Sequence, residues 1–148
     1  MAGVRTPSVS NPFYSHIFHY GSTSTNQAYG LTFISNLFAN HTWAGNNYAN
    51  QTINVSTNYI VGTNYVNTNS PRNRYFVNNS FPSTVGDYAI NTGTGQTPII
   101  GSRINPTSII PREEWGNGRI YFLLVYNRAL SDAEFTQNYN ALKSKLGL

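Results

Sequence analysis

The sequence predicts an all-β domain, a sandwich or a barrel, with one short helix at its C-terminal end. From residue 13 to about residue 97, short aromatic or β-branched runs alternate with clusters of Asn, Gly, Ser and Pro at the spacing of strands and turns. A long apolar run follows at residues 118–126, and helix-capping residues come soon after it. At 148 residues without cysteine, the chain is long enough for one core that needs no disulfides.

Residues 1–12 are expected to form an extended N-terminal arm. Thr6-Pro7 and Asn11-Pro12 place two prolines among small residues, a composition that favours extended backbone over a packed element. A single domain then spans residues 13–148. We expect the arm to become ordered on a neighbouring subunit, where it would add a strand to an exposed sheet edge. The residues assigned to this partner-binding arm are Val4, Arg5, Pro7, Val9 and Pro12.

The middle of the chain is expected to be a series of short strands. In most of them one pleat face carries the larger or more apolar side chains, as a half-buried strand requires. Turns are expected at Asn78-Asn79, Gly93-Thr-Gly95 and Asn105-Pro106, because Asn and Gly tolerate positive φ and Pro ends a ladder. The predicted strands are Ser15–Tyr20, Gly30–Phe38, Thr52–Ser56, Tyr59–Asn64, Arg74–Asn78, Tyr88–Ile90 and Pro98–Ile104.

The C-terminal part carries the strongest local signals. Residues 118–126 are apolar on both pleat faces, which predicts a central strand that is buried on two sides. Ser131 and Glu134 have the spacing of a capping box, and Leu130 and Phe135 occupy the two positions of a hydrophobic staple. We therefore expect one short α-helix that begins after Ser131 and packs on the β body.

Residues 118–143 resemble the C-terminal signature of laminin-G-like domains, members of the concanavalin A-like lectin/glucanase superfamily that are common in phage structural proteins. The segments Arg74-Tyr-Phe-Val-Asn-Asn79 and Ile99-Ile-Gly-Ser-Arg103 are similar to two upstream strands of that family. The resemblance implies a jelly-roll sandwich of two antiparallel sheets. It assigns structural roles to Tyr126, Asn127, Arg128, Leu130, Ser131, Glu134, Phe135 and Tyr139.

Charge is scarce in this sequence. Only 9% of the residues are charged, against roughly a quarter in an ordinary domain, and no Asp, Glu, Lys or Arg lies between Arg5 and Arg72. The centres of protein interfaces are depleted of Lys, Glu and Asp and enriched in Tyr, Trp and Phe. Much of the surface is therefore expected to face other protein chains; the alternative is a monomer kept soluble by Asn, Thr and Ser.

The acidic residues do not suit a hydrolase. Retaining glycosidases need two carboxylates about 5–5.5 Å apart across the scissile bond. Asp132 and Glu134 belong to the helix start, and the adjacent Glu113 and Glu114 would point to opposite faces of a strand. The sequence also has no Gly-x-Ser-x-Gly elbow for a serine nucleophile. We expect no enzyme activity and no catalytic residue.

Three histidines are the candidate metal ligands. His16 and His19 have a spacing that could chelate a metal on a helix, with His41 as a third ligand. In a strand, however, residues 16 and 19 face opposite sides, and no Cys or Asp is close. Structural or surface histidines are the favoured interpretation, and neither a metal nor another cofactor is expected.

Nucleic acid and membranes are not expected as partners. Arg72 and Arg74 beside Tyr75 could form a platform for bases and phosphates. The basic residues are nevertheless scattered along the chain without forming a charge stripe, although the sequence pI is about 9.5. No apolar run is long enough to span a bilayer.

The combined pattern predicts a non-enzymatic structural protein of a phage or other virus particle. It would be a capsid decoration or cement protein, or else a tail or fibre component, and its partners would be other copies of itself and a major capsid or other virion protein. Such a protein resides in the virion and is assembled in the host cytoplasm. The alternative is a lectin-like module for a host-surface polysaccharide, with Trp43, Trp115 and tyrosines such as Tyr48 and Tyr59 stacking on sugar rings.

Overall fold

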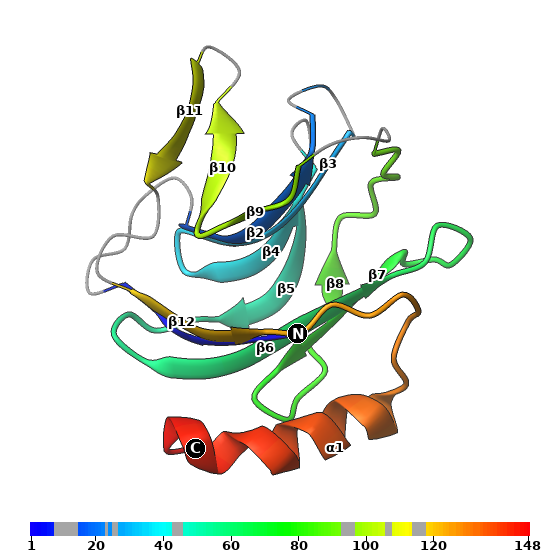
Figure 1. Cartoon of the computed structure of the whole chain (residues 1–148). Coiled ribbons are helices and arrows are strands. Elements are labelled where there is room, and N and C mark those ends of the chain that lie inside the picture. The colour runs from blue at the N-terminus through cyan, green and yellow to red at the C-terminus, as the bar shows by residue number, and fades with distance from the viewer. Residues whose placement is uncertain are drawn as a thin grey trace.

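The protein folds as a two-sheet antiparallel β-sandwich with one short α-helix near its C-terminal end (Figure 1), which confirms the predicted fold class. The jelly-roll topology implied by the family resemblance stays a prediction. The computed structural model describes residues 1–7, 15–22, 24, 27–42, 46–92, 97–105, 108–113 and 118–148.

The larger sheet has six strands in the order β8-β5-β4-β3-β2-β9. Four of them, β2 to β5, follow one another along the chain as antiparallel neighbours, so local hairpins build most of this sheet. Its strands are β2 (Ser15–Gly21), β3 (Ala28–Ile34), β4 (Leu37–His41), β5 (Asn46–Thr52), β8 (Thr84–Val85) and β9 (Ile99–Ile100).

The smaller sheet has four strands in the order β12-β1-β6-β7. Its strands are β1 (Ala2–Arg5), β6 (Asn58–Tyr65), β7 (Asn73–Val77) and β12 (Arg119–Leu123). Two further strands, β10 (Ser102–Asn105) and β11 (Ser108–Glu113), form a hairpin that stands beside the outer face of β2 (Figure 1).

Several predicted strands are confirmed and others are wrong in their limits. The predictions for β2, β6 and β7 agree with the structure to within one or two residues. The run from Gly30 to Phe38 is not one strand, because the chain turns at Ser35, which has a φ of 55°. Gly101, with a φ of 74°, separates β9 from β10 where one strand was predicted. The expected strands at Thr52–Ser56 and Tyr88–Ile90 do not form, since β5 ends at Thr52 and residues 88–90 are irregular.

The N-terminal residues are part of the sandwich, so the prediction of a free arm is wrong for residues 1–7. β1 is hydrogen-bonded to β12 on one side and to β6 on the other. Met1, Ala2 and Val4 are buried, and the Thr6 hydroxyl donates to the Asn54 carbonyl at 2.7 Å. Among the proposed arm residues, Val4 is thus a core residue and Arg5 and Pro7 belong to the ordered strand and its end. Val9 and Pro12 lie outside the described residues.

Residues 118–126, the apolar run before the helix, do not form a central strand, so the prediction of a strand buried on two sides is wrong. β12 pairs only with β1, and within the described part of the chain it forms the edge of the sheet. Val125 is 73% exposed and Tyr121 is 44% exposed, so neither side of this run is fully buried. A run that is apolar on both faces can therefore lie at a sheet edge.

The helix start follows the sequence prediction closely. α1 (Asp132–Leu142) continues into a 3₁₀ turn, η1 (Lys143–Leu146). The Glu134 amide donates to the Ser131 hydroxyl at 3.3 Å, and the Ser131 amide donates to the Glu134 carboxylate at 2.8 Å, which completes the capping box. Leu130 and Phe135 are buried in one apolar cluster, as the hydrophobic staple predicts.

The helix forms a third layer under the smaller sheet (Figure 1). Phe135 stacks on Phe76 of β7 at a ring-centroid distance of 5.3 Å, and Ile60 of β6 belongs to the same cluster. The main core lies between the two sheets and includes Ile17, Phe38 and Val61. The four-stranded sheet therefore has apolar side chains on both of its faces.

A polar bridge joins the two sheets inside this core. The Tyr75 hydroxyl of β7 accepts a hydrogen bond from the Asn40 amide of β4 at 3.1 Å and donates to the Asn47 carbonyl of β5. The Asn40 side chain also donates to the Asn73 side chain at 2.9 Å. All four of these residues are fully buried. Buried polar groups need such partners, so the bridge satisfies groups that would otherwise be costly to bury.

Candidate functional site

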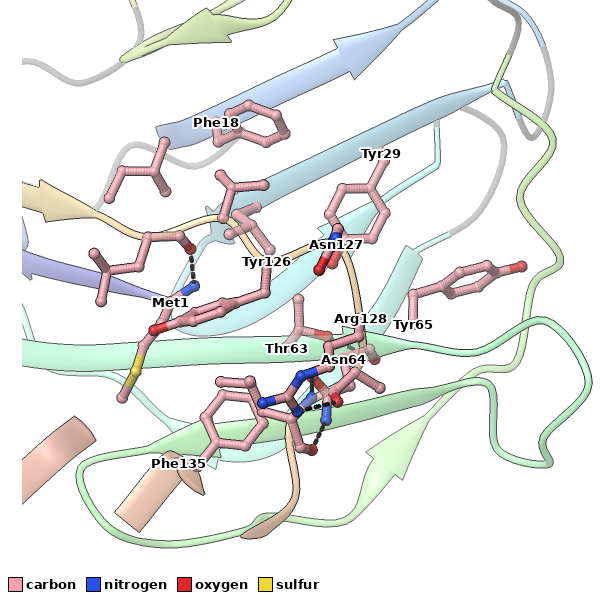
Figure 2. A pocket seen from close by; sticks show the side chains of 16 residues that line it. Met1, Phe18, Tyr29, Thr63, Asn64, Tyr65, Tyr126, Asn127, Arg128 and Phe135 are labelled. Atoms are coloured by element: carbon pink, nitrogen blue, oxygen red, sulfur yellow. Dashed lines mark hydrogen bonds between the residues drawn. The ribbon is translucent and has the colours of Figure 1, made fainter. Parts of the chain in front are cut away.

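The clearest candidate site is a cavity of about 340 Å³ at one end of the sandwich (Figure 2). One wall is the segment 124–130, which joins β12 to α1 and which we call the strap. Cavities of about 300–1,000 Å³ are typical of small-ligand sites. The two sheets contribute Phe18, Tyr29, Leu31, Thr63 and Tyr65 to the lining, and the helix contributes Phe135.

Some polar groups of the cavity already have hydrogen-bond partners within the protein. Burial raises the pKa of Tyr29, and the Thr63 side chain partly opposes that shift. The Met1 amino group donates to the Leu124 carbonyl at 2.8 Å, and burial lowers its pKa to about 6. No Asp, Glu, His or Cys is found among the described residues that line this cavity. The cavity is therefore suited to binding, and it offers no carboxylate or imidazole for general acid–base chemistry.

The strap is held in place at its C-terminal end. The Asn64 side chain donates to the Leu130 carbonyl and accepts from the Leu130 amide at 3.0 Å, so one residue of β6 satisfies both backbone groups. Arg128 pairs with the Glu134 carboxylate of the helix cap, and this hydrogen bond lowers the pKa of Glu134 to about 2. The structure thus brings the predicted signature residues together: Tyr126, Asn127, Arg128 and Leu130 in the strap, and Ser131, Glu134, Phe135 and Tyr139 in the helix and its cap.

An exposed apolar surface borders the cavity. Tyr121, Val125 and Tyr126, which we call the β12 rim, are 44%, 73% and 40% exposed. Tyr126 lines the cavity and is fixed there, because its hydroxyl accepts a hydrogen bond from Asn138 at 3.1 Å. Single exposed apolar residues are ordinary, whereas a group of them beside a sheet edge is typical of interaction surfaces. The β12 rim is such a group.

The three histidines lie on one face of the larger sheet, although the sequence placed His16 and His19 on opposite faces. The register of β2 against β3 shifts between His16 and Phe18, and this bulge turns Ile17 into the core. A Cβ atom added at Gly30 would lie 3.2 Å from the His16 ring and 3.4 Å from the His19 ring, so both rings lie over that glycine. His41 is directly opposite Gly30 on β4.

The histidine cluster is almost completely buried. His16, His19 and His41 are 0%, 0% and 4% exposed, and His16 Nε2 lies 3.2 Å from His41 Nδ1. A structural or catalytic zinc site needs at least three protein ligands that converge on one point. Within the described ranges, no three His, Cys, Asp or Glu side chains are arranged to hold a metal ion. His16 and His41 lie within hydrogen-bond distance of each other, and the His19 ring packs edge-on against His16 at a centroid distance of 5.7 Å.

The residues predicted to stack on sugars are not brought together by the described structure. Tyr48 is half-buried on β5, opposite Ala39. Tyr59 is a core residue whose hydroxyl accepts from the Asn54 amide at 2.9 Å, so its ring is not available for stacking. Trp43 and Trp115 lie outside the described residues.

The arginine pair considered for nucleic-acid binding has other roles. Tyr75 is fully buried and cannot serve as a stacking platform. Arg72 pairs with Asp87 at 2.9 Å, and its backbone amide also donates to that carboxylate, which lowers the pKa of Asp87. Arg74 pairs with Asp132 in the first turn of α1, and this hydrogen bond lowers the pKa of Asp132. Both arginines thus attach neighbouring segments to β7.

The acids considered for catalysis are only partly described. Asp132 is engaged by Arg74, and Glu134 by Arg128 and the helix cap. Only the backbone of Glu113 is described, in β11, and Glu114 lies outside the described residues. The cavity itself was missed by sequence reasoning. Its lining comes from strands of both sheets and from the strap, and no local pattern connects them.

No protein-family model, curated protein or solved structure matches this chain. The laminin-G-like resemblance therefore stays a prediction. Within the described residues, none of the helical segments has the length and apolar character needed to cross a membrane. Any functional proposal depends on the residues themselves and their geometry.

Proposed function

We propose that this protein is a non-enzymatic structural component of a virus particle that acts through protein–protein contacts. A capsid decoration or cement protein is the favoured form, and a tail or fibre component is its nearest variant. The observation that carries the proposal is the β12 rim, where exposed apolar side chains border the edge strand and the mouth of the cavity. An edge strand with such side chains favours pairing with another chain.

The distribution of charge supports protein contacts. The chain from residue 6 to residue 71 carries no Asp, Glu, Lys or Arg, yet it builds four of the six strands of the larger sheet and one strand of the smaller one. Surfaces depleted of charge and rich in tyrosine are typical of interface centres. The proposed partners are other copies of this chain and a major capsid or other virion protein. The laminin-G-like resemblance supports the particle setting, because such domains are common in phage structural proteins.

Particle association tests the proposal. Purified virions should contain the protein, and sedimentation of the free protein should show an oligomer. The Val125→Ser/Tyr126→Ser variant should remain folded and lose incorporation. Val85→Ser is the matched control, since Val85 is 52% exposed on β8 in the other sheet. A strictly monomeric protein that is absent from virions would refute the proposal.

A carbohydrate-binding role is the second candidate, and the cavity is the observation that favours it. Tyr29 and Tyr126 supply aromatic rings, and the Asn127 side chain can donate and accept hydrogen bonds. A glycan array with the wild-type protein and the Tyr126→Ala, Trp43→Ala and Trp115→Ala variants tests this role. Tyr88→Ala is a control, because Tyr88 is exposed and does not line the cavity. Binding that is equal in all variants would exclude both proposed stacking surfaces.

A further inference from the structure

The described cationic side chains fall into two groups. Arg72, Arg74 and Arg128 each pair with a carboxylate. The remaining four, Arg5, Arg119, Lys143 and Lys145, have no ion-pair partner among the residues that the structure describes. The chain has few charged residues, so cations without an ion-pair partner stand out. These four lie in one region of the surface, at β1, β12 and the C-terminal end of the helix.

Arg5 and Arg119 lie directly opposite each other. They are cross-strand partners in the ladder between β1 and β12, and both are exposed. Val4 points into the core between the sheets, so its neighbour Arg5 points to the opposite face, where α1 packs. Directly opposite side chains have Cβ atoms about 4.5–5.5 Å apart, and like charges at that distance repel each other. This pairing costs stability unless an anion lies between the two guanidinium groups.

The same face continues from Arg5 to the end of the helix. Asn58 of β6 is the partner of Arg5 on the other side of β1, and its side chain donates to the Leu146 carbonyl at 2.7 Å. That bond places η1, with Lys143 and Lys145, next to the row that contains the two arginines. Figure 1 shows the C-terminal end of the helix beneath this end of the smaller sheet.

The two lysines, Lys143 and Lys145, would not by themselves indicate a binding site. Basic residues are favourable at the C-terminal end of any helix, and the Lys143 ammonium lies 5.6 Å from the centre of the Tyr139 ring. The arginine pair has no such local explanation. Its guanidinium groups are planar forks that match the two oxygens of a carboxylate.

We propose that Arg5 and Arg119, extended by Lys145, form a docking patch for the carboxylate groups of an acidic partner protein. The inference rests on the proposed protein-contact function and names the chemistry of one partner surface. The patch is too small for a nucleic-acid footprint, which normally requires a longer basic stripe along the phosphate backbone. Two arginines at cross-strand distance suit one or two neighbouring Asp or Glu side chains.

A binding titration with a labelled oligoglutamate peptide tests the patch. The Arg5→Gln/Arg119→Gln variant should bind at least about tenfold more weakly, since a charge-assisted contact contributes about that factor. Arg74→Gln/Arg128→Gln removes the same charge elsewhere and should keep its affinity. The first variant should melt no lower than the wild type, because a repulsion is removed. Equal weakening in both variants, or no weakening in the first, would overturn the proposal.

Two further results separate this inference from the proposed function. Tighter binding of a single-stranded oligothymidylate that also depends on Arg5 and Arg119 would replace the acidic protein by nucleic acid and overturn the patch as described. If virions contain the wild-type protein and the Arg5→Gln/Arg119→Gln variant equally, the patch is wrong and the structural role remains. If virions contain neither, the proposed function itself fails.

Discussion

β1 and β12 are neighbours in one sheet, yet they differ in composition, in pairing and in burial. β1 is short and begins with the small residues Ala2, Gly3 and Val4. It is paired on both sides, and its inward side chains are fully buried. β12 is made almost entirely of large apolar residues, it is paired on one side, and it leads into Val125, the most exposed large apolar residue of the described chain. The burial of a strand therefore depends more on its position in the ladder than on its hydrophobicity.

Removal of residues 1–7 should produce the largest effect, the loss of cooperative folding. The deletion breaks the ladders to β12 and β6 and exposes the inner face of the smaller sheet. A fully buried apolar side chain contributes about 1.5–3 kcal/mol, and a domain has only about 5–15 kcal/mol of stability in total. Thermal unfolding followed by circular dichroism measures the outcome. A truncated chain that melts cooperatively near the wild-type midpoint would show that β1 is dispensable.

Gly3→Ala should be the next most damaging change, because β1 and β12 are closely packed at this position. A Cβ atom at Gly3 would lie 2.2 Å from the Phe122 ring, so the ring must move. Overpacking of this kind costs about 1–3 kcal/mol. Phe122→Leu in the same chain should recover part of that cost, which a double-mutant cycle of unfolding free energies measures. A neutral Gly3→Ala in both backgrounds would contradict the register of the pair.

Leu130→Ala and Val125→Ala compare the two ends of the strap. Leu130 is buried under the helix as part of the staple, and its truncation should cost about 2–5 kcal/mol. Val125 is exposed, and its truncation should stay within about 0.5 kcal/mol of the wild type. Urea unfolding of both variants gives the two free energies. Similar losses of unfolding free energy in the two variants would contradict a strap that is buried at Leu130 and exposed at Val125.

The smallest effect concerns pH and the helix cap. The bond from Arg128 and the cap bonds from Ser131 lower the pKa of Glu134 from its ordinary value of 4.5 to about 2. Because the folded-state pKa is the lower one, this stabilisation is present above pH 4.5 and is lost as the pH falls towards 2. The melting temperature of Glu134→Gln should therefore lie below that of the wild type at neutral pH. A difference between the two that does not shrink on acidification would contradict this assignment.

Local features were predictable from the sequence. The capping box and staple depend on Leu130, Ser131, Glu134 and Phe135, which lie within one and a half turns of each other, and the structure confirms all of these roles. β2, β6 and β7 were also found, because their side chains alternate in size or polarity along the strand. The turn at Asn78-Asn79 followed from the tolerance of Asn for positive φ, and both residues have it.

Features that depend on how strands pair with distant segments were not predictable from the sequence. β5 was missed because most of its residues are polar, although Ala49 belongs to the main core and the Asn47 carbonyl takes part in the Tyr75 bridge. The hairpin turn at Ser35-Asn36 has only the weaker turn residues Ser and Asn, without Gly or Pro, and the apolar residues on both sides favoured one continuous strand. The bulge at Ile17 brought His16 and His19 to one face and reversed the strand argument. The cavity and the Arg5–Arg119 pair depend on register between distant segments, which a single sequence does not reveal.

The Tyr75 bridge has a mechanical consequence for the sandwich. An apolar core resists the separation of two sheets, but it resists sliding only weakly, because one apolar contact replaces another as the layers move. The hydroxyl of Tyr75 is hydrogen-bonded to the Asn40 amide of β4 and to the Asn47 carbonyl of β5. Displacement by one residue would leave buried amide and carbonyl groups without partners. The bridge therefore opposes sliding of the two sheets and fixes how they are aligned with each other.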